Sequence, residues 1–126
     1  MITKGLVRVG GMYGLAARWS LTGAPQGLEQ QLRDYVVTES LARFSQLDGL
    51  SFKTWRMVAG EWFEGTYVFA TAAARDAFHA SFTAAAPTAP VSVMIGSAPI
   101  EITRVEVVAV AEGPAGFASG PGPGTD

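Results

Sequence analysis

The stretch FKTWRMVAGEWFEGTYVFATAAARDAFHASF, residues Phe52–Phe82, decides the fold of this chain. LSFKTWRMV (50–58) and TYVFAT (66–71) are rich in β-branched and aromatic residues, which is typical of strands. We expect AGEWFEG (59–65) to be the turn between them, and AAARDAFHASFTAAA (72–86) to form a helix that Pro87 ends. The stretch therefore predicts a hairpin followed by a helix.

The segments on either side complete the pattern. QGLEQQLRDYVVTESLARFSQ (26–46) has apolar residues at helical intervals, and Asp48-Gly49 stops that helix. PTAPVSVMIGSAP (87–99) fits either an irregular crossing or one short helix, and IEITRVEVVAVA (100–111) predicts the last strand. MYGLAARWSLTG (12–23) predicts the first strand, because one face collects Tyr13, Leu15, Ala17, Trp19 and Leu21.

The order of elements is strand, helix, strand, strand, helix, strand. It predicts an α+β, ferredoxin-like βαββαβ fold, with helices on one face of a four-stranded antiparallel sheet. Both faces of the strands look largely apolar, so we expect a homodimer in which a second copy packs sheet to sheet. We assign residues 1–111 to this domain. Residues 112–126 are rich in Gly and Pro and are predicted to be a flexible tail.

Composition excludes several classes of function. With a net charge of −2 and nine scattered basic residues, the chain lacks the basic surface that nucleic acid requires. Arg8 and paired glycines interrupt the N-terminal apolar stretch, so we predict neither a signal peptide nor a membrane helix. The absence of cysteine fits a reducing compartment, and seven Arg against two Lys fit a high-GC genome. We expect a cytoplasmic, bacterial protein without a nucleic-acid or membrane partner.

The same inventory argues against bound cofactors. A single histidine and dispersed carboxylates do not suggest a metal site. Neither a GxGxxG motif opening a helix nor a phosphate loop is present, so nucleotide cofactors lack their usual cradle. The sequence predicts no metal and no cofactor.

A family resemblance covers the central stretch most specifically. Gly49 with LSFKTW, followed by EGTYVFATAAARDAFHA (64–80), resembles the Gly-Phe-x-Trp-Lys-x-Trp and Gly-Gly-x-Tyr-Leu-Phe-Thr patterns of YdhR-like monooxygenases. These belong to the dimeric α+β barrel superfamily. ARWSLTGAP (17–25) is similar to the end of the family's first strand and its Asn-Gly-Pro turn, although Thr22 replaces the Asn and Phe52 replaces a usual Trp. The matching positions are Gly49, Phe52, Lys53, Trp55, Gly65, Tyr67 and Phe69.

The resemblance implies a dimeric α+β barrel with one pocket per protomer between helices and sheet. It also implies oxygenation of a flat, electron-rich aromatic or polyketide-like substrate without cofactor, since an ionised phenol or enol can itself give electrons to oxygen. A non-oxidative cyclase or isomerase using the same pocket, and a ligand-binding dimer without turnover, are the alternatives.

Candidate site residues follow from the aromatic clustering. We predict catalytic roles in proton handling for Tyr67 or His79, although His79 fits a surface position on its helix better. Arg18 is an anchor for a substrate oxygen, an exposed charge at a sheet edge or, preferably, half of an ion pair across the dimer with Glu101 or Glu106. We expect Trp62 and Phe63, in the turn, to contact the partner. Core packing alone explains any one aromatic, but together they suggest substrate-binding walls: Trp19, Phe52, Trp55 and Phe69, with Arg18.

Overall fold

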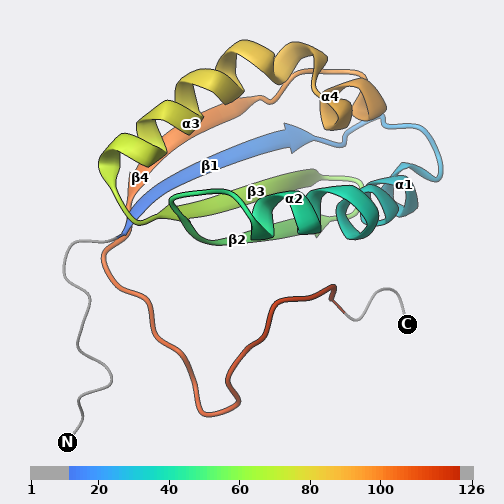
Figure 1. Ribbon diagram of the computed structural model, residues 1–126. Coiled ribbons are helices and arrows are strands. Elements are labelled where there is room, and N and C mark those ends of the chain that lie inside the picture. The colour runs from blue at the N-terminus through green and yellow to red at the C-terminus, as the bar shows by residue number, and fades with distance from the viewer. Residues whose placement is uncertain (1–11, 123–126) are drawn as a thin grey trace, which may run out of the picture.

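Four antiparallel strands form one sheet, and all helices lie on one of its faces (Figure 1). This is seen in a computed structural model that describes residues 12–122. The strands are β1 (Tyr13–Ser20), β2 (Leu50–Val58), β3 (Trp62–Phe69) and β4 (Glu101–Glu106). The helices are α1 (Leu28–Tyr35), a π-helical segment (Val36–Ser40), α2 (Leu41–Ser45), α3 (Ala72–Ala85), a 3₁₀ turn (Ala86–Thr88) and α4 (Pro90–Ile95).

The strand order is β2-β3-β1-β4, so each half of the chain contributes one outer and one central strand. Every neighbouring pair is antiparallel. The predicted α+β, ferredoxin-like fold is therefore confirmed. Residues 87–99, left open between a crossing and a helix, contain the short helix α4.

Alternation along the strands separates a helix-facing side from an outer side. On the helix-facing side, Trp19 lies opposite Phe63 and Leu15 opposite Tyr67. These residues pack against Leu28, Leu32, Ile95 and other apolar side chains of the helices. The core thus lies between the sheet and the helices, as the period-2 pattern of the first strand predicted.

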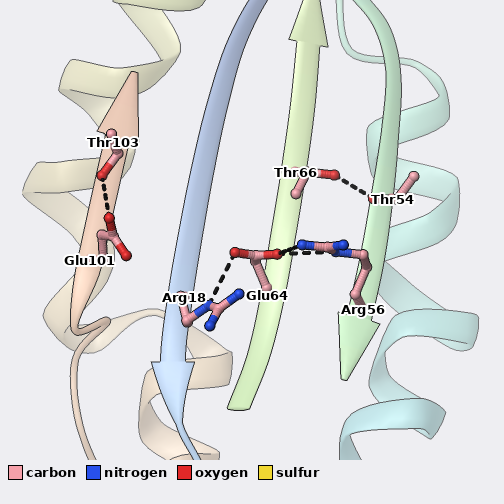
Figure 2. Close-up of polar contacts among 7 residues, drawn as sticks. All are labelled: Arg18, Thr54, Arg56, Glu64, Thr66, Glu101 and Thr103. Carbon is pink, nitrogen blue, oxygen red and sulfur yellow. Dashed lines mark hydrogen bonds and ion pairs between the residues drawn. The ribbon is translucent and has the colours of Figure 1, made fainter. Parts of the chain in front are cut away.

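The outer side is more polar than the sequence suggested. Glu64 is only 6% exposed and accepts hydrogen bonds from Arg18 on β1 and Arg56 on β2 (Figure 2). The hydroxyls of Thr54 and Thr66 contact each other beside them. A polar row therefore crosses the middle of a face that was expected to be largely apolar.

The hairpin turn is shorter than predicted. The amide of Glu61 donates to the carbonyl of Val58, and β3 begins at Trp62. Strand alternation then buries Phe63 on the helix-facing side and puts Trp62 on the outer side, where the Arg18 guanidinium lies 4.0 Å from its ring centre. The assignment of Trp62 and Phe63 to the turn is wrong, because both belong to β3, and the ring of Phe63 packs in the core of the chain.

The last strand ends earlier than expected. β4 stops at Glu106 instead of Ala111, and residues 107–122 contain neither helix nor strand. Figure 1 shows this segment leaving the sheet and running back along the side of β2. The interruption of the N-terminal stretch at Arg8 lies outside the described residues. Within residues 12–122, no helix has the length and apolar character needed to cross a membrane.

Candidate functional site

A cavity of about 550 Å³ lies between the helix-facing side of the sheet and the surrounding helical segments. Its size is in the range of small-molecule sites. A larger hollow of about 810 Å³ runs along β2 and is partly walled by residues 117–122. The smaller cavity is the better candidate because buried aromatic rings surround it. The buried ones are Trp19, Phe44, Phe63 and Tyr67, and the partly buried Phe78 and Phe82 also line the cavity.

One wall comes from the helix that follows β1. This helix contains the π-helical segment Val36–Ser40, where the run Val36-Val37-Thr38 weakens regular α-helix because β-branched side chains are restricted there. Single π-helical turns occur frequently at functional sites. Ser40, at the end of the segment, and Arg43 and Phe44, just after it, all line the cavity.

Lys53 is the most unusual residue of the site. Its Nζ atom lies 3.4 Å from the ring centre of Phe44, 4.3 Å from that of Tyr67 and 4.5 Å from that of Trp55. No hydrogen bond or ion pair joins it to another side chain of the described part of the chain. Because no fully buried side-chain nitrogen or oxygen there lacks a partner, the unpartnered amine is not fully enclosed, and Lys53 lines both this cavity and the larger hollow along β2.

The surroundings of Lys53 set its protonation. Desolvation by burial, reinforced by the positive charge of Arg43, lowers the pKa of Lys53 well below its ordinary value. Aromatic ring faces attract the ammonium form and offset part of this effect. Because the lowering effects are larger, the amine of Lys53 gives up its proton more readily than a surface lysine does.

Tyr67 shifts in the opposite sense. Burial raises the pKa of its hydroxyl, and the charge of Arg43 compensates only in part. Tyr67 therefore keeps its proton at neutral pH and acts as a hydrogen-bond donor. The ring is held between Phe69, Phe78 and Phe44, with ring centres 4.9 to 6.2 Å apart.

Gly65 provides the floor beneath these two side chains. A Cβ atom placed there would lie 3.2 Å from Cε of Lys53 and 3.3 Å from the hydroxyl oxygen of Tyr67. The residue paired with Gly65 on the neighbouring strand β1 is Ala17, which is also small. The two small residues leave the space that larger side chains would fill.

Three of the predicted site residues meet in this cavity: Trp19, Trp55 and Tyr67. Trp19 is anchored by a hydrogen bond from its Nε1 to Oγ of Ser92 at 3.0 Å. Trp55 packs edge to face on Phe44, with ring centres 6.0 Å apart.

The other four lie elsewhere. Phe52 pairs with Val68 on the outer side and does not line this cavity, but together with Trp55 it lines the larger hollow along β2. Arg18 is also on the outer side, where it pairs with Glu64 of the same chain, and an ion pair with Glu101 or Glu106 across a dimer stays a prediction. Phe69 is buried in the core behind Tyr67, and His79 on α3 does not line the cavity.

Several polar residues of the cavity were not selected from the sequence: Ser40, Arg43 and Lys53, and also Tyr35, Ser81 and Thr88. Lys53 carried a signal, because it shares the strand face of Trp55 and Met57 and so interrupts an apolar row with a charge. Ser40 and Arg43 carried no such signal. Regular helical spacing would indicate which side of the helix they face, but the π-helical segment changes that spacing. No cluster of three or more His, Cys, Asp or Glu that could hold a metal ion occurs between residues 12 and 122.

Comparison with known proteins yields structural neighbours only. No family model and no curated protein matches the chain. The NE2512 protein of Nitrosomonas europaea, whose function is unknown, has 25% identity and a TM-score of 0.58, covering 85% of this chain and 98% of that one. A candidate antibiotic biosynthesis monooxygenase from Chloroflexus aurantiacus J-10-fl has 17% identity and a TM-score of 0.47, covering 79% and 96%. The first of these likenesses supports the fold.

Proposed function

We propose that this chain is a small monooxygenase-like protein that binds a flat aromatic or polyketide-like substrate in the cavity and ionises it for reaction with oxygen. The observation that carries the proposal is the amine of Lys53, open to a cavity walled by aromatic rings. The YdhR-like motif, which includes Lys53, Trp55 and Tyr67, agrees with it.

The chain's own residues supply the acid-base chemistry. Lys53, with its lowered pKa, accepts the proton of a phenol, enol or activated CH₂ group. The protonated Tyr67 donates a hydrogen bond to the oxygen on which negative charge develops. Sequence analysis predicted the proton-handling role for Tyr67 or His79, and the geometry favours Lys53 as the base.

The oxidation balances without a further reductant. An activated CH₂ group and one O₂ give a carbonyl group and one water: the carbon loses four electrons, one oxygen atom enters the product and the other leaves as water. The ionised substrate donates these electrons itself. The protein must bind the ring system, remove the proton and keep bulk water from the carbanion.

Oxygen uptake tests the proposal. We would incubate the protein with a hydroxylated anthrone in an oxygen electrode cell, with a protein-free blank for autoxidation, and measure the anthraquinone formed. We expect one O₂ consumed per quinone, and a rate lowered about 100-fold or more in Lys53→Met, because a general base contributes roughly 10²–10⁴. Equal rates of oxygen uptake for Lys53→Met and the native chain would refute the role of Lys53 as the base. A rearranged product under anaerobic conditions would instead favour the cyclase or isomerase.

We also propose that the working form is a homodimer joined through the outer side of the sheet. Val58 and Val105 on this side are 39% and 42% exposed, and they flank the polar row around Glu64. Sedimentation should give twice the chain mass. Thr66→Arg, at the middle of this side, should give monomers, while Thr83→Arg on the exposed part of α3 should not. A native chain that sediments as a monomer at micromolar concentration would refute the dimer.

A further inference from the structure

The charged residues of the cavity are unbalanced. Arg43 and Lys53 line it, and no Asp or Glu is among the lining residues. Four of the five other arginines in the described chain pair with carboxylates: Arg18 and Arg56 with Glu64, and Arg75 and Arg104 with Asp76. The cavity is therefore a place where two basic groups come together without an acidic partner.

The two basic groups affect each other. The charge of Arg43 contributes to lowering the pKa of Lys53, after the larger effect of burial. Their nearest aromatic neighbour is shared, since the Arg43 guanidinium lies 4.8 Å and the Lys53 amine 3.4 Å from the ring centre of Phe44. Arg43 is exposed and Lys53 half-buried, and two positive charges near each other are unfavourable, so an anion between them would relieve both.

Neutral hydrogen-bond donors complete the arrangement. Ser40 is only 3% exposed, and its hydroxyl makes no hydrogen bond within the described chain, so it also contacts cavity space. The hydroxyl of Tyr67 is protonated for the reason given above. An ionised oxygen beside these groups would meet two basic side chains and two hydroxyl donors.

We infer that the cavity is an anion site for flat aromatic molecules, with the ligand's ionised oxygen held between Lys53 and Arg43 and its rings against Trp19 and Trp55. The inference deepens the proposed function by naming the charge of the ligand: it selects aromatic acids and phenolates over neutral and cationic molecules of the same shape. It does not require turnover.

Three probes with one ring system test it: 2-naphthoate, 2-naphthamide and 2-naphthylmethylammonium. Titration calorimetry of the full chain at neutral pH should show naphthoate binding at least about tenfold more tightly than the amide, with the ammonium compound weakest, since a charge-assisted contact replaces a neutral one. Lys53→Met and Arg43→Gln should each reduce this preference. Arg18→Gln, which removes a charge from the outer side, is the matched control and should leave it unchanged.

The outcomes separate the two proposals. Equal affinity for naphthoate and the amide, or no binding of any probe at millimolar concentration, would overturn the anion site. The double variant combines Lys53→Met with Arg43→Gln. If it is folded by circular dichroism and still prefers naphthoate over the amide, the roles of Lys53 and Arg43 would be overturned. Anion selectivity without oxygen uptake by an anthrone would refute the oxygenase alone, and oxygen uptake without anion selectivity would refute this inference alone.

Discussion

The Nζ atom of Lys53 on β2 lies 3.4 Å from the ring centre of Phe44 on α2. The strand β2 and the helix α2 are thus in contact through the amine of Lys53 and the aromatic ring of Phe44. The contact ties the protonation of Lys53 to the position of the helix, because the same helix carries Arg43.

The first prediction concerns pH and stability. The pKa of Lys53 is lower in the folded than in the unfolded chain, so the unfolded chain binds more protons between the two values and stability rises with pH there. Lys53→Met removes this penalty. We expect its melting temperature to exceed that of the native chain at pH 7 and the difference to shrink as the pH approaches about 10.4, the unfolded value. A pH-independent difference in calorimetry would contradict the buried amine.

Glu64 gives a stability effect of the opposite sign. Burial alone would raise its pKa, but hydrogen bonds and charges from Arg56 and Arg18 outweigh burial and lower it. Its contribution is therefore present above the unfolded pKa of about 4.3 and is lost as pH falls through the folded value. Glu64→Gln should cost about 1–2 kcal/mol at pH 7, since both arginines are partly exposed, and much less near pH 3. Urea unfolding at the two pH values measures this.

Two glycines on opposite faces make a matched pair. Gly65→Ala places a methyl group against Lys53 and Tyr67 in the cavity, and we expect naphthoate affinity to fall about tenfold or more with little change in stability. Gly14→Ala meets Cγ2 of Val105 at 2.5 Å on the outer side. It should cost about 1–3 kcal/mol through overpacking and leave affinity unchanged. Indistinguishable affinities of the two variants would place the ligand elsewhere.

Trp55 and Phe52 provide a similar contrast on one strand. Trp55→Leu should weaken naphthoate binding and cost only about 1–2 kcal/mol, because Trp55 borders open space and a closed core would lose about 3–5 kcal/mol. Phe52→Leu, on the other face, should leave naphthoate affinity unchanged. Thermal unfolding and titration of both variants decide the matter: a large fall in melting temperature with unaltered affinity in Trp55→Leu would mean that Trp55 belongs to the core.

The fold was largely predictable because it follows from local periodicity. Alternation placed Trp19 on the correct face of β1, and Asp48-Gly49 marked the end of the first helical region, with Gly49 at a φ of 86°. The same rule applied consistently would have separated Phe52 from Trp55. The aromatic residues were grouped by type instead of by face.

The cavity was less predictable because its polar residues depend on tertiary contacts. Nothing local in the sequence tells that Arg43 from a helix and Lys53 from a strand share one space. Glu64 shows the same limit, since its two arginines come from strands 46 and 8 residues away. Pairings of this kind follow from sheet register, which sequence periodicity alone does not determine.

The π-helical segment Val36–Ser40 divides the helical wall into two halves of different phase. Each residue of an α-helix turns the chain by about 100°, so one residue gained or lost within the wider turn would rotate everything after it by that angle. Leu28 and Leu32 would stay in the core, while Arg43 and Phe44 would swing away from Lys53 and other side chains would take their place. A change of one residue in length, more than any substitution, would therefore give this scaffold a different specificity.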